Sequence, residues 1–401
     1  GTTTFDRCYI GTSNVPPQTT DTTFVGTQLA MSAESKLVKG INFVKYVEPL
    51  YVDDNIVVGV GKDKQMVVTP DDMFLLVGHS SLPDYSGISV YEINSVDWKL
   101  TPIETTVFDD IKDFGCRALS FGGDILFVGL DRSPWGKIYK YEEGNFTFLT
   151  DLGNINTPPV SNSAISPDGR YLAVKNSNTS SNNTPKTFVY KIESGSLSAI
   201  GSISTRFVSF LTFSLDNKLA VGQRHDGVSI YKVDDMEIQL EFETNFSTSR
   251  TCHDGIFDSR GNLFITATNE SSTNNNPAIH RIYWDGVNFN EQNSIFLGAS
   301  MSRDDQYRLS IVDDNIYMNY GRSMLININY LRFRFVDSIN PDIYLGKAVS
   351  GVLIKSGGVF MTVTKDGLLG AYKIRSDFIP TASYARQWTF PAGVGTGIVN
   401  R

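Results

Sequence analysis

Seven short apolar runs recur along the chain, each preceded by a tight polar turn. The clearest copy spans residues 161–178, where Pro167-Asp168-Gly169 separates two stretches in which apolar and polar side chains alternate. Proline presets φ for the second position of a type I turn, and glycine tolerates the left-handed backbone needed to leave that turn. Alternation with a period of two on both sides predicts two antiparallel strands joined by this turn.

The strand after this turn, "YLAVK" at 171–175, has close copies elsewhere. They are "FLLVG" ending at Gly78, "ILFVG" ending at Gly129 and "KLAVG" ending at Gly222, with weaker copies at 263–267, 315–319 and 359–363. A third strand follows with the signature Tyr-(Glu/Lys)-(Ile/Val), at Tyr91, Tyr190, Tyr231 and Tyr372 and more loosely at Tyr141 and Tyr283. A fourth, more polar strand comes next. The turns recur every 43 to 54 residues, and four strands per unit of that length are typical of a β-propeller blade.

The repeats predict an all-β fold: a seven-bladed β-propeller of four-stranded antiparallel blades, with an extended N-terminal arm. The propeller is expected over residues 62–392, with "SYARQWTF" at 383–390 as the fourth strand of the last blade and residues 393–401 as a C-terminal tail. Residues 1–61 form an N-terminal arm or latch, and their first 25 positions are rich in Thr, Pro, Gly and Asn, which suits an extended segment. The stretch 43–52 either adds a strand that closes the ring or belongs to an arm that docks on a partner.

Composition narrows the function classes. The chain has 401 residues, 41% of them hydrophobic, so a sizeable core can form, and its formal net charge of -8 argues against a general nucleic-acid binder. No run of 18 apolar residues occurs, so we expect no membrane insertion. The three cysteines lack C-x-x-C spacing, and the four histidines lack metal-binding spacing, so no cofactor, metal or catalytic residue is predicted.

Candidate binding residues lie in the loops that join the second and third strands of each blade. Function in a propeller is expected on the face with long, varied loops, and the turns between the first and second strands are short here. Arginine and aromatic side chains suit recognition of a protein or a sugar, although solvated loop tips are the simpler interpretation. The candidates are His79, Tyr85, Arg132, Trp135, Arg224, His225 and Asp226.

A second group of candidates is predicted near the mouth of the central channel. The connections between blades open on the same face and carry Arg117, Arg206, Arg250 and Arg303. Such a ring of arginines would attract an anion or a carboxylate, but pairing with nearby aspartates such as Asp113, Asp304 and Asp305 is the favoured alternative. His253 lies in a first strand and would reach the channel.

With "SPDGRYLAV" in one copy and "TPDDMFLLVG" followed by "ISVYEI" in another, the chain resembles seven-bladed propellers with WD40-like and YVTN-like repeats. The resemblance covers residues 62–392 and implies an architecture, because this fold hosts many unrelated functions. A single Trp-Asp pair occurs, Trp284-Asp285, and Gly78-His79 follows a second strand, so the hydrogen-bonded tetrad of WD40 repeats cannot be carried over. The Asn-, Ser- and Thr-rich composition and the arm are more loosely similar to propeller-type structural proteins of tailed-phage virions.

The sequence therefore favours a non-enzymatic structural or interaction propeller. The expected setting is a virion, as a capsid or tail component anchored by its arm among other proteins of a larger assembly; otherwise the protein is expected to be soluble or extracellular. One alternative is an adhesin that binds surface glycans through Trp135 and Tyr85. Another is a hydrolase or lactonase with polar residues gathered at the central channel.

Overall fold

The structure of the protein is a computed structural model with two compact units, Tyr46–Arg375 and Gly1–Lys45 together with Ser376–Arg401. It describes residues 9–11, 26–28, 35–37, 47–57, 65–82, 85–153, 160–176, 186–205, 207–223, 227–244, 250–269, 277–296, 308–312, 315–319, 323–327, 334–339, 348–354, 359–364, 368–374, 386–388 and 397–399. Among these residues no helix is long and apolar enough to cross a membrane.

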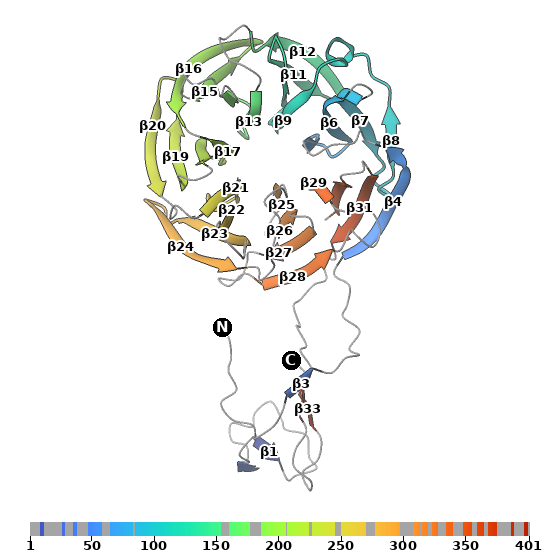
Figure 1. Cartoon of the computed structure of the whole chain (residues 1–401), viewed down its shortest axis with the longest axis vertical. Coiled ribbons are helices and arrows are strands. Elements are labelled where there is room, and N and C mark those ends of the chain that lie inside the picture. The colour runs from blue at the N-terminus through green and yellow to red at the C-terminus, as the bar shows by residue number, and fades with distance from the viewer. Residues whose placement is uncertain are drawn as a thin grey trace. The chain divides into compact units, whose positions relative to one another are not determined.

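Seven four-stranded antiparallel sheets, the blades, form a ring in the larger unit (Figure 1). Blade 1 contains β5 (Gln65–Val68), β6 (Phe74–Leu82), β7 (Tyr85–Ile93) and β8 (Leu100–Ile103). Blade 2 contains β9 (Cys116–Gly122), β10 (Ile125–Leu130), β11 (Gly136–Glu142) and β12 (Asn145–Asp151). Blade 3 contains β13 (Val160–Ile165), β14 (Tyr171–Asn176), β15 (Lys186–Glu193) and β16 (Ser196–Ser204). Blade 4 contains β17 (Val208–Phe213), β18 (Lys218–Gln223), β19 (Gly227–Val233) and β20 (Ile238–Thr244).

The remaining three blades complete the ring. Blade 5 contains β21 (Arg250–Phe257), β22 (Leu263–Asn269), β23 (Pro277–Trp284) and β24 (Phe289–Phe296). Blade 6 contains β25 (Arg308–Val312), β26 (Asn315–Asn319), β27 (Ser323–Asn327) and β28 (Arg334–Ile339). Blade 7 contains β29 (Ala348–Ile354), β30 (Val359–Thr364), β31 (Leu368–Ile374) and β4 (Val47–Val57). The strands of each blade are called A to D from the channel outward. The first strands of successive blades are in contact, and β29 meets β5 to close the ring.

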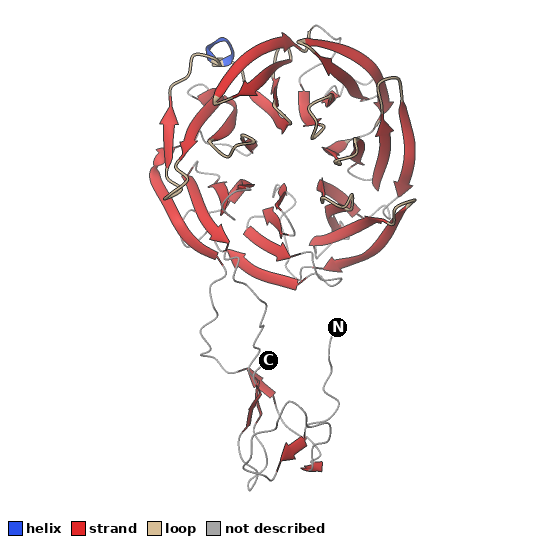
Figure 2. Cartoon of the chain, turned by 180° about the vertical axis from the view of Figure 1, so that it is seen from behind, coloured by secondary structure: helices blue, strands red, loops and turns tan. Residues whose placement is uncertain are grey.

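The predicted all-β, seven-bladed architecture is confirmed, and the described helical structure is one 3-10 turn, Asp109–Ile111, between blades 1 and 2 (Figure 2). The predicted N-terminal arm falls mostly outside the described residues. Its described strands β1 (Tyr9–Gly11) and β2 (Gly26–Gln28) pair with each other, and β3 (Ser35–Leu37) pairs with β32 (Arg386–Trp388). Strand β33 (Gly397–Val399) also pairs with β32.

The outer strand of blade 7 comes from the N-terminal segment, which confirms the alternative in which the stretch 43–52 adds a strand that closes the ring, and not from segment 383–390. Segment 383–390 supplies β32 to the smaller unit, whereas β4 pairs with β31 over seven positions from Leu368↔Val57 to Ile374↔Val47. The ring unit therefore covers Tyr46–Arg375 instead of 62–392, and the ring is closed by the N-terminal segment. Proline within sheets is confined to edge strands and irregularities, and Pro49 meets both conditions: β4 is an edge strand, and its pairing with β31 shifts register between Ala371 and Tyr372, the partner of Pro49.

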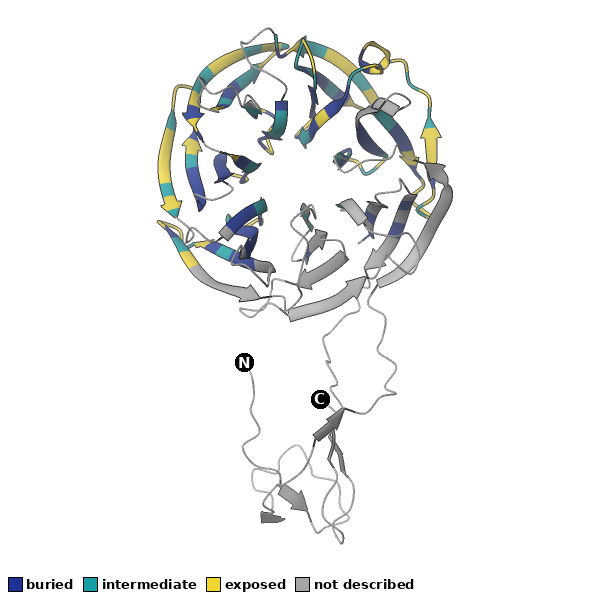
Figure 3. Cartoon of the chain, viewed as in Figure 1, coloured by how far each residue is buried: buried dark blue, intermediate teal, exposed yellow. Residues whose placement is uncertain are grey.

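The core lies between neighbouring blades. Every residue of the B strands β10 and β18 is buried, whereas exposed and partly buried residues mix along the D strand β12 (Figure 3). One apolar cluster joins blades 7 and 1, with Met361 and Leu369 packed in the same group as Leu75 and Val77. Each B strand is therefore covered on both faces by adjacent sheets, which explains why these strands are the continuous apolar runs seen in the sequence.

The A–B turns of blades 1, 3 and 4 share a hydrogen-bonding pattern. A hydroxyl at the end of the A strand donates to the carboxylate two residues later: Thr69 to Asp71 (2.7 Å), Ser166 to Asp168 (2.5 Å) and Ser214 to Asp216 (2.5 Å). The same hydroxyl accepts a hydrogen bond from the backbone N–H of the first B-strand residue. In blade 3, for example, the Tyr171 N–H donates to the Ser166 hydroxyl at 2.8 Å. Aspartate is frequent in these turns because it satisfies their backbone and hydroxyl groups.

Candidate binding surfaces

His79 was predicted to be exposed in a loop, but the structure buries it inside blade 1. Strand β6 continues to Leu82, so His79 remains within the sheet, where it is 4% exposed. Its Nε2 lies 2.7 Å from the Ser89 hydroxyl on β7. This histidine therefore contributes to the blade and is not presented to a partner.

Arg132 and Trp135 share one turn of blade 2. The Trp135 N–H donates to the Arg132 carbonyl (2.9 Å), and the Arg132 guanidinium lies 3.4 Å from Asp131 and 5.4 Å from the centre of the Phe114 ring. The Arg132 side chain is 59% exposed, whereas Trp135 is half-buried against the core between blades 2 and 3. Tyr85 lies in β7, but its side chain is outside the described set, and 224–226 are outside the described residues.

The predicted channel residues are not brought together in the described structure. Arg117 is exposed on β9 of blade 2, whereas His253 on β21 of blade 5 has its Nε2 2.8 Å from the Thr268 hydroxyl in the same blade. Arg250 begins β21, and its side chain is not described. Positions 206 and 303 lie outside the described residues, so the arginine ring stays a prediction.

Exposed apolar side chains gather on the face of the ring where the A–B and C–D turns lie, opposite the face that carries the B–C loops. We call this face the turn face. Nine large apolar residues in the described part of the chain are substantially exposed, and six of them are at or beside these turns. The six are Met73 (44%), Val96 (87%), Leu215 (64%), Met236 (86%), Tyr283 (37%) and Val287 (76%). Loop length alone predicts function on the other face, whereas these exposed apolar residues concentrate at the short turns.

The turn face also carries an excess of negative charge. Ten turn segments of blades 1 to 5 contain fifteen acidic and seven basic residues, a net charge of -8 that equals the net charge of the whole chain. The segments are 69–74, 92–100, 122–125, 140–145, 166–171, 191–196, 214–218, 232–238, 258–263 and 283–289. A ligand approaching this face therefore meets a negative potential.

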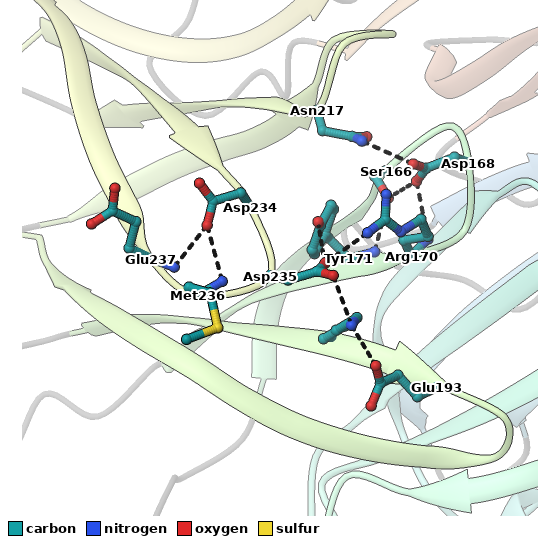
Figure 4. A network of polar contacts seen from close by, with 11 residues as sticks. Ser166, Asp168, Arg170, Tyr171, Glu193, Asn217, Asp234, Asp235, Met236 and Glu237 are labelled. Carbon is teal, nitrogen blue, oxygen red and sulfur yellow. Dashed lines mark hydrogen bonds and ion pairs between the residues drawn. The ribbon is translucent and has the colours of Figure 1, made fainter.

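A groove of about 490 Å3 lies on the turn face where blades 3 and 4 meet. Asp235, in the C–D turn of blade 4, accepts hydrogen bonds from three groups of blade 3: Arg170 Nη2 (2.7 Å), the Tyr171 hydroxyl (2.7 Å) and Lys191 Nζ (2.9 Å) (Figure 4). The bond from Lys191, followed by that from Tyr171, lowers the pKa of Asp235 to about 2. Asp235 is therefore ionised at neutral pH and ties the two blades together.

A second contact crosses the boundary between blades 3 and 4, which we call the seam. Asn217 of blade 4 donates to Asp168 of blade 3 at 2.8 Å, and Asp168 also accepts from the Ser166 hydroxyl. Burial opposes ionisation of Asp168, but these hydrogen bonds outweigh it and lower its pKa. Polar residues that line the groove are thus hydrogen-bonded to one another and to Asp168 across the boundary between blades 3 and 4.

Two exposed apolar side chains belong to turns that form this groove: Met236 lines it, and Leu215 directly precedes Asp216, another lining residue. Asp234 accepts the backbone N–H groups of Met236 (2.9 Å) and Glu237 (3.0 Å), which fixes the C–D turn and leaves Met236 exposed at its tip. Leu215 is exposed in the A–B turn of the same blade. Turn chemistry alone favours Gly, Pro, Asn or Asp at such tips, so neither side chain is required by the turn that carries it.

Comparison with known proteins supports the fold. No protein-family model matches the chain, and no curated protein matches it in sequence. Among solved structures, the periplasmic gluconolactonase PpgL of Pseudomonas aeruginosa aligns with a TM-score of 0.57 and 14% identity, over 81% of this chain and 94% of that chain. YCF48 bound to D1 peptide aligns with a TM-score of 0.50 and 10% identity, over 80% of this chain and 99% of that chain.

These structural likenesses, together with the sheet topology, define the class: the protein is a β-propeller. At 14% and 10% identity they show the fold alone. The looser resemblance to phage virion proteins gains no support from either structure.

Proposed function

We propose that the protein is a non-enzymatic interaction propeller whose turn face binds a partner segment carrying apolar and basic side chains. The observation that carries this proposal is the exposure of Leu215 and Met236 on two turns of one blade beside an acidic groove. Exposed apolar residues that cluster are typical of interaction sites, and the acidic surroundings select a positively charged partner. YCF48, a propeller of similar fold, was solved with a bound peptide.

The two exposed apolar side chains would supply a measurable part of the binding free energy. Complete burial of a Leu or Met side chain contributes about 1.5–3 kcal/mol, so engaging Leu215 and Met236 contributes a few kcal/mol together. The negative potential of the turn face adds mainly to the association rate and to selectivity, and that part weakens as salt increases. Binding through this face should therefore depend both on the two apolar tips and on ionic strength.

A peptide library tests the proposal directly. Twelve-residue random peptides displayed on phage would be selected against the immobilised full chain, with counter-selection against a Leu215→Ser, Met236→Ser double variant. The enriched peptides should combine Lys or Arg with large apolar residues. Leu240→Ser is the matched control, since Leu240 is half-exposed on the outer strand of the same blade. Enrichment of acidic peptides, or enrichment that the double variant retains, would contradict the proposal.

Placement in a virion, with residues 1–61 as an anchor, remains a prediction from composition. It requires stoichiometric copies on a particle that are lost when the anchor is deleted.

Lactone hydrolysis is the second candidate, favoured by the extent of the structural match to a gluconolactonase. It is tested by adding D-glucono-1,5-lactone to the purified chain and measuring acid release with a pH indicator. Hydrolysis above the spontaneous rate that is lost in His253→Ala would favour this candidate over the interaction proposal.

A further inference from the structure

Lys175 places a positive charge where the equivalent positions of four other blades have none. It is the fourth residue after the turn-side end of β14 and pairs with Asn162 of β13. The pairing registers of the other A and B strands identify its counterparts as Gly78, Gly129, Gly222 and Thr266. The glycines fit closely against neighbouring atoms: a Cβ at Gly78 would lie 2.5 Å from Cys116 Sγ. Blade 3 therefore departs from the repeat by inserting an ammonium group at the seam with blade 4.

The described surroundings of this ammonium do not neutralise it. Lys175 Nζ donates to the backbone carbonyl of Val208, the first residue of β17, at 2.6 Å. No carboxylate lies within ion-pair distance of it among the described residues, and burial lowers the pKa of Lys175. Lys175 is partly buried, and removing an ammonium group from water is costly unless an opposite charge and further hydrogen bonds compensate it. One of its three N–H groups is used by Val208, so two remain for other acceptors.

A purely structural role does not require the charge. At the same seam, Asn162 Nδ2 donates to the carbonyl of Ser209, which is the residue skipped in the pairing of β17 with β18. Gln65 Nε2 of blade 1 makes the corresponding, longer contact (3.5 Å) with the carbonyl of Arg117, skipped in the pairing of β9 with β10. Neutral amide side chains therefore satisfy these strand irregularities, and a lysine is not needed to do so.

We propose that Lys175 is the centre of a carboxylate-binding site on the loop side of the seam between blades 3 and 4. Lys175 lies at the loop-side end of β14, which Asn176 terminates, so the site faces away from the turn face. A carboxylate there would accept charge-assisted hydrogen bonds from the ammonium. The carboxylate belongs either to a free small acid or to an acidic side chain of a partner protein. The site is independent of the turn-face proposal, and either can fail alone.

Trace acetylation of the native full chain tests this site. Deuterated acetic anhydride reacts with the neutral amine, releasing acetate and a proton, and peptide mass spectrometry then reports the labelling of each lysine from pH 6 to 10. Glutarate serves as the small acid, and a capped Gly-Glu-Gly-Glu-Gly peptide represents a protein side chain. Saturating ligand should reduce Lys175 labelling about tenfold or more, because a bound carboxylate holds the amine protonated. Exposed Lys99 is the internal control and should keep its labelling.

The two ligands distinguish the two sources of the carboxylate. Protection of Lys175 from labelling by glutarate indicates a small acid, and protection by the peptide alone indicates an acidic partner. In a separate calorimetric titration, Lys175→Gln should abolish binding of whichever ligand protects, whereas Lys175→Arg should retain part of it. If Lys175→Gln does not fold, the protection of Lys175 from labelling in the native chain still tests the proposal. Protection no greater than that of sodium chloride at equal ionic strength overturns the proposal. A several-fold rise in ligand-free Lys175 labelling in Asp226→Asn also overturns it, since an internal carboxylate would then fill the site.

Discussion

Replacing Gly222 by alanine should destabilise the propeller, because the aromatic ring of Phe210 occupies the space. A Cβ at Gly222 would lie 2.0 Å from Phe210 Cε1 and 2.3 Å from Cδ1, whereas carbon atoms pack at about 3.5–4.0 Å. The ring cannot retreat, since a Cβ at Gly255 on its other side would already lie 2.3 Å from Cε2, and Phe210 is 1% exposed. Overpacking of this kind costs about 1–3 kcal/mol, and the lack of free space places Gly222→Ala at the upper end.

Thermal unfolding of the full chain measures this cost. A loss of about 3 kcal/mol corresponds to a melting temperature lower by roughly 6–12 °C in a domain of a few hundred residues. Gly201→Ala is the matched control, since a Cβ there would meet only the terminal methyl of Ile238, at 3.2 Å. That control should be neutral or slightly stabilising because alanine restricts the unfolded chain.

A double-mutant cycle isolates the contact. Phe210→Leu removes the distal ring atoms, so Gly222→Ala should cost at least about 1 kcal/mol less in that background than in the wild type. The reasoning is refuted if Gly222→Ala melts at the same temperature as Gly201→Ala. It is also refuted if the two substitutions at 210 and 222 are additive.

Three further predictions concern contacts between blades and the closure of blade 7. Tyr141→Phe removes the 2.6 Å bond to Asp71 and should cost about 0.5–1.5 kcal/mol at pH 7 in urea unfolding. Burial raises the pKa of Asp71, but hydrogen bonds from Tyr141 and Thr69 outweigh it and lower that pKa. The difference in unfolding free energy between the wild type and Tyr141→Phe should therefore shrink as the pH falls below about 4 and Asp71 is protonated. A difference that stays constant down to pH 3 would count against this. Lys218→Met should cost about 1–2 kcal/mol in the same assay, because the buried ammonium lies 3.4 Å from the centre of the Trp284 ring; an unchanged midpoint would contradict it. A chain of residues 46–375 should unfold cooperatively, whereas 58–375 lacks β4 and should lose on the order of 5 kcal/mol and self-associate through β31 in light scattering; equal stability of the two would refute closure by β4.

The repeat made most of the ring predictable. A–B turns and B strands are local features with strong turn residues and continuous apolar runs, so the pattern located them in every blade. For the outer strand of blade 7 the sequence offered two candidates, 43–52 and 383–390, and could not choose between them, because the pairing of β4 with β31 joins segments more than 300 residues apart and local alternation does not specify a partner. The third-strand register was also misread in blade 2, where Tyr139 pairs with Leu126 as Tyr190 pairs with Leu172, so Tyr139 is the counterpart and Tyr141 is not.

Candidate sites were less predictable than strands. His79 looked like a loop residue because the B-strand copies end at Gly78, but β6 continues past it. Leu215 and Met236 occur in turns that the repeat marks as tight, and only solvent exposure showed that they project beside an acidic groove. Lys175 occupies a position where three copies of the repeat have glycine, but its partial burial and its contact with Val208 depend on the neighbouring blade.

The central proposal is that the turn face binds a basic, apolar partner segment. Its most direct test is calorimetric titration of a library-selected peptide into the wild-type chain and the Leu215→Ser, Met236→Ser double variant at 50 and 300 mM salt. The account predicts at least tenfold weaker binding to the double variant at both salt concentrations, and weaker binding to the wild type at the higher one. Equal affinity of the two proteins, or affinity that does not change with salt, would contradict it.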